Sequence, residues 1–472
     1  MIDLAPLRPL RVAGPGRQLL HNPTFLLLMF LLTHVPLALL LRRAPALATL
    51  HALAALGVGL HYTFSGRQLV RVAYVAAYLT GAEILWRMAE AQVPWEFAKY
   101  ATAGLFVLAL ARSNQLRGPL LPLLYLLLLV PSVAFTVLEG TDDIRSLISF
   151  NLSGPLLLMV GAWFFSNVRL TRAQWHYLFA ALLGPVIGVA GIALYTLLTT
   201  SNIQFTDESN FATSGGYGPN QVAAVLGLGA LFALFILLDK AQTLRLRLLM
   251  FGLMMWLGSQ SALTFSRGGL YNAGLAALTA ALFLLRERRS RFQLLLVAAV
   301  VFALANYLVL PTFDSFTAGA FVTRFSDTSL SGRDQIALAD VDLWLANPLF
   351  GVGPGRADLL RVDNRGGAAA HTEYSRLLSE HGLFGLGALL FLIVMAVRNF
   401  RNARTPWEQA LTAALIAWSA IYMSGAAMRL AAPALLLSLA FASCFAEQSA
   451  EDDPAEVWLR PRALGAPVRS ES

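Results

Sequence analysis

Cysteine and charged residues are both scarce in this chain of 472 residues. Its single cysteine, Cys444, excludes an internal disulfide and a cluster of thiolate metal ligands. Charged residues make up 13% of the chain, whereas roughly 25% is typical of soluble domains. No internal repeat or low-complexity tract is visible in the sequence. The composition therefore excludes an ordinary soluble domain, a disulfide scaffold and a repeat protein.

Apolar residues make up 57% of the chain and form runs long enough to cross a bilayer. Because backbone polar groups must be satisfied inside a membrane, such runs predict helices. We predict an all-α fold, a polytopic transmembrane helix bundle with about 12–14 spans. No cleavable signal peptide is expected, since the first residues are polar and Arg-bearing. The predicted spans are residues 24–41, 45–62, 69–88, 98–112, 118–137, 146–166, 176–198, 220–238, 248–266, 268–285, 291–310, 383–398, 408–425 and 430–446.

Basic residues are distributed unequally between the two sets of connecting segments. With the N-terminus inside, the inner segments carry 22 of the 35 Lys and Arg residues, the short outer loops carry 7, and segment 311–382 carries 6. Positive charge collects on the cytoplasmic side of membrane proteins. Both termini are therefore predicted to be cytoplasmic and segment 311–382 to lie outside. The net charge of +8 reflects this topology, and we expect no nucleic-acid partner because the inner charges are scattered.

The same patterns predict four regions along the chain. Residues 1–310 form a transmembrane bundle, 311–382 a long and partly helical outer loop, 383–446 C-terminal transmembrane helices, and 447–472 a disordered cytoplasmic tail. A loop of this length between spans is uncommon unless it has a function.

The long loop contains a predicted helix and a glycine-rich turn. The helix covers Asp334–Leu345 and ends at the Asn-Pro pair that follows. Residues 351–356 read Gly-Val-Gly-Pro-Gly-Arg, which lacks the third glycine of a dinucleotide fingerprint and predicts a rigid turn whose backbone can pass close to a ligand. Asp340 and Asp342 lie two apart on the helix and should face nearly opposite sides. We therefore expect no metal site and no cofactor.

His371 follows a glycine- and alanine-rich stretch and begins a predicted helix that Gly382 caps. The positive end of a helix dipole disfavours the imidazolium, so a neutral base is expected there. His381 is the weaker candidate, because the other helix end favours the charged form. A capping or interfacial histidine without a catalytic role remains the alternative for His371.

Two further polar elements lie at the outer ends of apolar runs. Ser266-Arg267-Gly268-Gly269 places an arginine beside two glycines, where a ligand could approach the backbone closely. The alternative is an arginine that extends to the membrane interface. The connection Thr199–Asn220 is predicted to be a structured turn, with Asn220 as the N-cap of the next span.

These elements, taken together, resemble the O-antigen ligase family. His371-Thr372 with Gly382-Leu383-Phe384-Gly385 resembles the periplasmic His motif of that family, although an amide or serine more usually follows the histidine. The turn around Arg267 resembles its outer Arg turn. Gly332-Arg333, the segment 347–355 and Pro219-Asn220 resemble stretches shared with O-antigen polymerases.

The resemblance implies transfer of a glycan from an undecaprenyl-diphosphate-linked donor to a lipid A–core acceptor, at the periplasmic face of a Gram-negative inner membrane. His371 would act as general base. Arg267 and Arg333 would bind the diphosphate. The further donor-binding residues would be Arg356, Ser266 and Asn220. The reaction would be inverting and metal-independent. Membrane lipids would surround the helix bundle. The other arginines of the loop, Arg324, Arg361, Arg365 and Arg376, are expected to be solvated.

Three alternative functions remain open. The same residues could polymerise O-antigen repeats or glycosylate a protein, because no motif names the acceptor. A lipid-linked oligosaccharide flippase is the alternative outside enzymes, but it should show two similar halves and charged residues within its spans. The oligomeric state is not indicated by the sequence.

Overall fold

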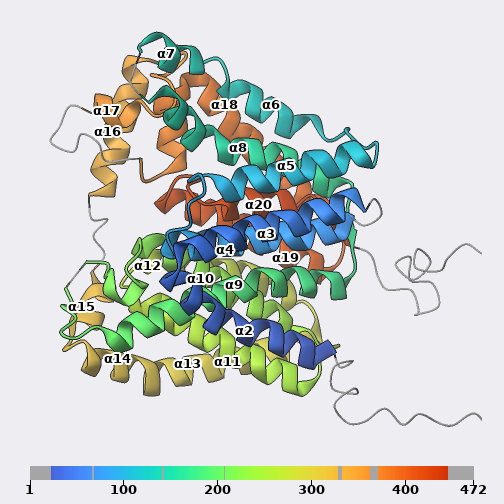
Figure 1. Cartoon of the computed structure of the whole chain (residues 1–472), viewed down its shortest axis with the longest axis vertical. Coiled ribbons are helices and arrows are strands. Elements are labelled where there is room, and N and C mark those ends of the chain that lie inside the picture. The colour runs from blue at the N-terminus through green and yellow to red at the C-terminus, as the bar shows by residue number, and fades with distance from the viewer. Residues whose placement is uncertain are drawn as a thin grey trace, which may run out of the picture.

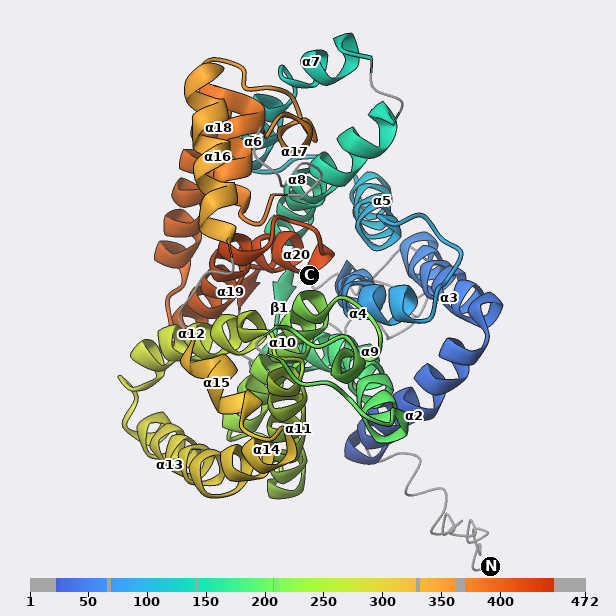
Figure 2. The same cartoon turned by 90° about the vertical axis from the view of Figure 1, so that its left-hand side faces the viewer.

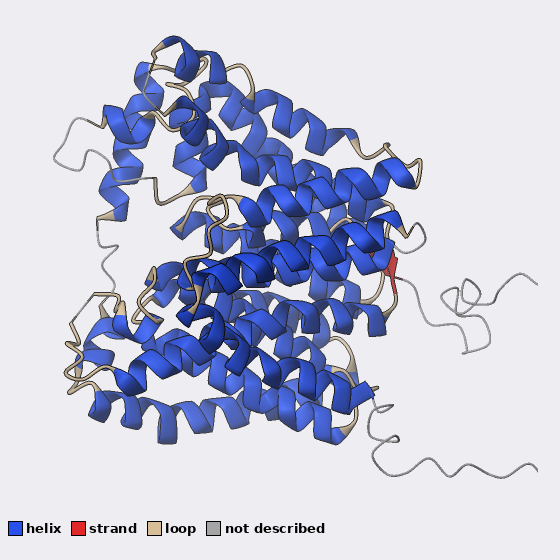
Figure 3. Ribbon diagram, viewed as in Figure 1, coloured by secondary structure: helices blue, strands red, loops and turns tan. Residues whose placement is uncertain are grey.

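The computed structural model describes residues 23–65, 69–140, 143–206, 208–327, 332–361 and 370–444 of the chain. These residues form a bundle of helices, with one short strand pair, as Figure 3 shows. Within them, ten helices are long and apolar enough to cross a membrane. The predicted all-α polytopic bundle is confirmed. The predicted tail, 447–472, lies outside the described residues.

The helices follow the predicted apolar runs closely. Their bounds are α2 Pro23–Arg43, α3 Pro45–Phe64, α4 Leu69–Met88, α5 Phe97–Arg112, α6 Leu120–Leu129, α7 Val133–Leu138, α8 Ile144–Ser166, α9 Arg172–Thr199, η1 Ala212–Ser214, α10 Pro219–Leu238, α11 Leu244–Leu263, α12 Arg267–Leu284, α13 Arg288–Leu304, η2 Ala305–Val309, α14 Leu310–Phe316, α15 Ala320–Ser326, α16 Arg333–Ala346, α17 Ala357–Leu360, α18 Glu373–Asn402, α19 Pro406–Gly425 and α20 Ala431–Leu439.

Four of the predicted spans are not among the ten long, apolar helices. They correspond to α5, α12, α19 and α20. The first three run for 16 to 20 residues. The last one, predicted over residues 430–446, is a helix of only nine residues, and all nine are buried. Nine residues span about 14 Å, roughly half of the hydrocarbon thickness. The prediction of a full-length helix there is therefore wrong, and the total of about 12–14 spans stays a prediction.

The centre of the bundle is α9, which packs against α2, α4 and α10 (Figure 1). A capping box between Thr171 and Gln174 starts this helix. Its small residues allow close helix contacts, because a Cβ at Gly188 would meet the Ala38 side chain at 3.0 Å. Phe179 stacks on Phe232 of α10 with ring centroids 4.4 Å apart. The core is thus built from small residues and interleaved aromatic rings.

The two ends of the bundle carry different structures. Figure 1 shows the helices of the predicted outer segment along its left-hand side, with α16 and α17 at the upper left and α15 at the lower left. At the opposite end, the strands β1 (Arg169–Leu170) and β2 (Ser443–Cys444) pair in parallel (Figure 3). Helical structure continues across the predicted region boundaries, through α14 at residue 310 and through α18 at residue 382.

Candidate functional site

His371 lies immediately before the N-cap of α18. Thr372 is that N-cap, and its hydroxyl accepts a hydrogen bond of 3.1 Å from the backbone N–H two residues later. The helix therefore starts slightly after the predicted position. The half-buried imidazole forms no hydrogen bond within the described residues. Burial, followed by the charges of Arg429, Arg333 and Arg361, lowers the pKa of His371 to about 4, so the ring is neutral at pH 7.

Arg429, in the connection between α19 and α20, lies beside His371. Its Nη2 donates a hydrogen bond of 2.6 Å to the carbonyl of Ala370. The backbone N–H of Met428 donates one of 3.1 Å to the carboxylate of Glu373. These two bonds tie the α19–α20 connection to the start of α18. Arg429 is not among the predicted site residues, although it is one of the few basic residues in the predicted outer loops.

Arg333 is the first residue of α16 and lies among other cations. Burial, followed by the charges of Arg267, Arg324 and Arg429, lowers the pKa of its guanidinium group. A Cβ added at Gly425 would lie 3.7 Å from Nη1 of Arg333, which places the guanidinium at the end of α19. Within the described residues, it forms no ion pair or side-chain hydrogen bond. This position favours the binding of an anion.

Arg267 and Arg324 converge on Asp327, at the end of α15. Nη1 of Arg267 donates a hydrogen bond to the backbone carbonyl of Asp327 and lies 4.0 Å from its Oδ2. Nη1 of Arg324 lies 3.9 Å from the same carboxylate oxygen. Arg324 is 8% exposed and donates a hydrogen bond to the Phe265 carbonyl, so the expectation that it is solvated is wrong. One carboxylate serves two guanidinium groups, which leaves positive charge in excess beside Arg333.

A hydrogen bond of 2.7 Å joins the side chains of Ser266 and Asn220, with the serine hydroxyl donating. Gly218 is the N-cap of α10 and Pro219 its first residue, so the predicted capping role of Asn220 is wrong. The bond instead connects the N-terminal ends of α10 and α12. It fixes the backbone immediately before Arg267.

The two glycines after Arg267 have different surroundings. A Cβ at Gly269 would lie 2.2 Å from the carbonyl oxygen of Ala223, so this glycine allows α10 and α12 to pack closely. At Gly268 the nearest atom, the Ser266 hydroxyl oxygen, would be 3.9 Å away. The sequence predicted room for a ligand beside both glycines. The structure leaves that room only at Gly268. The Arg267 side chain is 14% exposed, which disfavours an arginine that simply extends into water.

The site thus gathers His371, Arg333, Arg267 and Arg429 at one end of the bundle, where Figure 2 shows α12 and α15 beside α16 and α18. Residues 261–392 match the family model described as O-Antigen ligase. Over these residues the chain is similar to the O-antigen ligase family. The match includes Arg267, Arg333 and His371 but neither Asn220 nor Arg429. No curated protein matches the chain.

The glycine-rich turn, which lies within the matched residues, packs against protein. Gly353 has a φ of 95°, and a Cβ there would lie 2.6 Å from Oγ1 of Thr136 in α7. The same Oγ1 donates a hydrogen bond of 3.0 Å to the Pro354 carbonyl. Arg356 forms an ion pair of 2.8 Å with Glu139. The predicted rigid turn is present, but the backbone that was expected to approach a ligand approaches α7 instead.

The turn also supports a break in α18 at Gly382, where φ is 59° and ψ is −135°. The break interrupts the helical hydrogen bonds. The N–H of Val352 donates to the Ser379 carbonyl at 2.9 Å, and the N–H of Leu383 donates to the Pro348 carbonyl at 2.8 Å. The predicted helix end at Gly382 is therefore a bend within one helix, held by the turn before it.

Asp340 anchors α16 to the two elements that follow it. Its carboxylate accepts hydrogen bonds of 2.9 Å and 2.7 Å from Arg361 and one of 2.7 Å from the Ser375 hydroxyl. Asp340 is completely buried whereas Asp342 is exposed, so the two aspartates face different sides as predicted. Within the described residues, no group of three or more His, Cys, Asp or Glu side chains could hold a metal ion.

Arg361 and Arg376 are buried, and the expectation that they are solvated is wrong. Arg376 forms ion pairs of 2.5 Å with Glu373 and 2.6 Å with Glu380. Because Glu373 also binds the backbone of the α19–α20 connection, this network supports the position of Arg429. The predicted solvated residue Arg365 lies outside the described residues. His381 is fully buried and its Nδ1 contacts the Ser132 hydroxyl.

Proposed function

We propose that this protein is an O-antigen ligase, which transfers a glycan from undecaprenyl diphosphate to a lipid A–core sugar at the periplasmic face of a Gram-negative inner membrane. The position of Arg333 supports this most strongly. Its half-buried guanidinium has no anionic partner among the described residues, yet Arg267 and Arg429 lie close by and a neutral His371 lies on the same side. A lipid diphosphate supplies the missing negative charge.

The arginines suit the leaving group of this reaction. As the bond between the anomeric carbon and the phosphate oxygen breaks, negative charge grows on the diphosphate. Arg333 and Arg429 hold that charge, and Arg267 contributes from the N-terminus of α12. Guanidinium groups bind phosphate oxygens in a fixed planar geometry, so they stabilise the leaving group without requiring a metal ion.

His371 is placed to accept the proton of the sugar hydroxyl. The acceptor oxygen attacks the anomeric carbon, its proton passes to the imidazole, and undecaprenyl diphosphate leaves. A single displacement inverts the anomeric centre. Burial, together with the surrounding arginines, holds the pKa of His371 low in the absence of donor. A bound diphosphate neutralises those charges, so donor binding raises the pKa of the base to a more effective range.

The general-base role is tested with the purified full-length protein and a lipid-linked donor. His371→Ala is expected to bind donor normally and to lose glycan transfer by about 10²–10⁴-fold. His61→Ala, which changes an exposed histidine at the predicted cytoplasmic end of α3, is the matched control. Transfer at the normal rate by His371→Ala would overturn this assignment.

The acceptor is tested in a strain that lacks the protein, by a gel of its lipopolysaccharide. If the missing protein is a ligase, the gel shows core without attached glycan, and full-length carrier-linked polymer accumulates in the strain. Core that bears a single repeat would indicate a polymerase, and normal lipopolysaccharide with an unglycosylated protein would indicate a protein glycosyltransferase. Repeat units held on the inner leaflet would indicate a flippase.

A further inference from the structure

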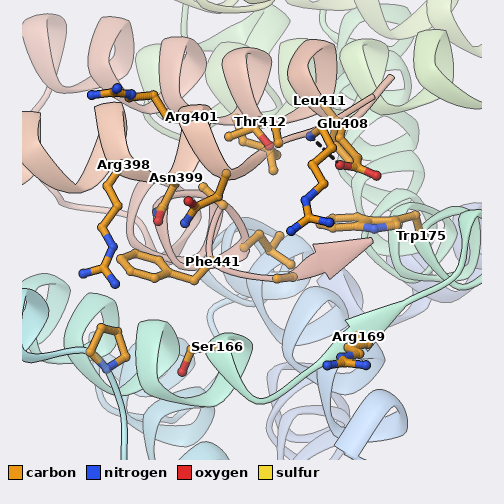
Figure 4. A pocket seen from close by; sticks show the side chains of 18 of the residues that line it. Ser166, Arg169, Trp175, Arg398, Asn399, Arg401, Glu408, Leu411, Thr412 and Phe441 are labelled. Atoms are coloured by element: carbon orange, nitrogen blue, oxygen red, sulfur yellow. Dashed lines mark hydrogen bonds between the residues drawn. The ribbon is translucent and has the colours of Figure 1, made fainter. Parts of the chain in front are cut away.

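A cavity lies at the opposite end of the bundle from His371. Its volume is about 950 Å³, and it lies between the ends of α8 and α18 and the starts of α6 and α19 (Figure 4). The part of α18 beyond Gly382 covers roughly 30 Å at 1.5 Å per residue, which matches the hydrocarbon thickness of a bilayer. The distribution of basic residues predicts that this end faces the cytoplasm.

Arginine dominates the charge of this cavity. Its lining residues include Arg117, Arg169, Arg398, Arg401 and Arg404. In the part of the chain that the structure describes, none of these five guanidinium groups forms an ion pair or a side-chain hydrogen bond. One acidic residue, Glu408, also lines the cavity, but its carboxylate already accepts hydrogen bonds of 2.8 Å and 3.4 Å from the backbone N–H groups of Arg404 and Thr405. The cavity therefore has a large excess of positive charge.

A buried amide adds a second, independent feature. Asn399 is 7% exposed and lines the cavity, and its carboxamide has no hydrogen-bond partner among the described residues. Figure 4 shows this side chain between Arg398 and Phe441. Because this amide lines the cavity, its N–H groups can donate a hydrogen bond to a ligand there.

Apolar surfaces continue from the arginines in two directions. Inside the cavity, Leu411 and Leu415 form part of the wall. Outside it, Val394 and Val397 of α18 are 47% and 50% exposed and lie one helical turn before Arg398 and Arg401. On α6, Leu120 is 61% exposed and follows Arg117 closely in the chain. The ligand is therefore expected to carry acyl chains as well as an anionic group, which distinguishes a lipid from a soluble phosphate.

We propose that this cavity binds the phosphate-bearing headgroup of an anionic membrane phospholipid. Arg398 and Arg117 hold the phosphate, Asn399 donates a hydrogen bond to it, and the acyl chains lie along the exposed faces of α6 and α18. The cavity volume is in the range of small-molecule sites. Basic pockets between transmembrane helices on the cytoplasmic side are suited to such headgroups.

The test measures lipid retained by the full-length protein in detergent, by native mass spectrometry, during titration with phosphatidylglycerol or phosphatidylcholine. The wild-type protein is expected to retain phosphatidylglycerol in preference. Loss of each arginine should weaken binding about fivefold, so Arg117→Ala with Arg398→Ala should weaken it roughly 25-fold. Arg398→Lys keeps the charge and should lose less than Arg398→Ala.

Arg245→Ala is the matched control, because Arg245 is exposed, lies on the same predicted side and does not line the cavity. Equal retention of the two lipids by the wild-type protein would overturn the proposal, as would equal losses in the double variant and in Arg245→Ala. Inorganic phosphate is titrated in parallel. Binding of inorganic phosphate by the wild-type protein but not by the double variant, without lipid preference, would assign the site to a soluble phosphate compound instead. Thermal unfolding confirms that each variant is folded.

Discussion

Arg429 donates a hydrogen bond of 2.6 Å to the carbonyl of Ala370, the residue that precedes His371. The bond links two segments separated by almost 60 residues, and it brings a guanidinium group next to the candidate base. The charge of Arg429 is also the largest electrostatic contribution that lowers the pKa of His371, after burial. The α19–α20 connection is therefore part of the site, although no sequence motif marks it.

Replacing Arg429 is expected to impair transfer strongly without unfolding the protein. In Arg429→Ala the diphosphate loses one of its cations, and turnover should fall by about 10²-fold. The matched control is Arg145→Ala, because Arg145 is exposed, lies on the same predicted side and has no side-chain partner among the described residues. Steady-state transfer with purified protein measures both. Equal turnover in the two variants would remove Arg429 from the site.

The pH dependence of kcat/KM should report the low pKa of His371 in the free enzyme. Transfer requires the neutral ring, so the rate should fall only as the pH drops well below 6.5, toward a pKa of about 4. Removal of the Arg429 charge takes away one of the causes that lower this pKa. The acidic limb of Arg429→Gln should therefore move to higher pH. An acidic limb at the ordinary pKa of histidine, unchanged in the variant, would contradict this electrostatic description.

Transfer is expected to continue in excess chelator. Arg267, Arg333 and Arg429 supply the positive charge that a divalent ion provides in other diphosphate-cleaving enzymes. The measurement compares initial rates with and without EDTA in the purified system, after dialysis to remove loosely bound ions. A loss of activity that Mg²⁺ or Mn²⁺ restores would contradict the proposed charge stabilisation by arginine alone.

The class of fold and the end of α16 could be predicted from sequence because they depend on local patterns. Apolar runs predict the spans, and Asn347-Pro348 correctly predicts the end of α16. The neutral state expected for His371 agrees with its lowered pKa, but the cause differs. Burial and three arginines lower that pKa, whereas the prediction invoked the helix dipole.

Features that depend on tertiary contacts could not be predicted in this way. Arg324 and Arg361 lie in a polar segment and were expected to be solvated, yet their partners bury them. Asp340 is close to Arg361 only because α16 and α17 pack together. Likewise, the sequence predicts a rigid glycine-rich turn but not that α7 lies against it. Arg429 lies beside His371 only because the last helices pack against the start of α18.

Removal of the Asp340 carboxylate should destabilise the protein substantially. Asp340→Ala removes the carboxylate that pairs with the buried Arg361, and loss of one member of a buried ion pair costs about 3–5 kcal/mol. Asp342→Ala, two residues away on the exposed side, should change stability by less than about 0.5 kcal/mol. Denaturant or thermal unfolding in detergent compares the two. Similar stabilities would show that the Asp340–Arg361 pair does not hold α16 to α17.

The break in α18 should depend on glycine for two separable reasons. Gly382 has a φ of 59°, and a Cβ there would lie 2.6 Å from the Leu349 carbonyl. Gly140 has a nearly identical φ of 61°, but a Cβ would meet nothing within 4 Å. Gly140→Ala should therefore lose only the stability that a left-handed conformation costs a residue with a Cβ, about 1–2 kcal/mol. Gly382→Ala adds a collision with backbone that cannot move aside.

We expect Gly382→Ala to lower the unfolding temperature much further than Gly140→Ala. It should also reduce transfer, because the same break sets the direction of the helix that carries His371 at its start. Equal unfolding temperatures in the two variants would mean that the backbone around Leu349 can shift, and that the turn does not hold the bend in place.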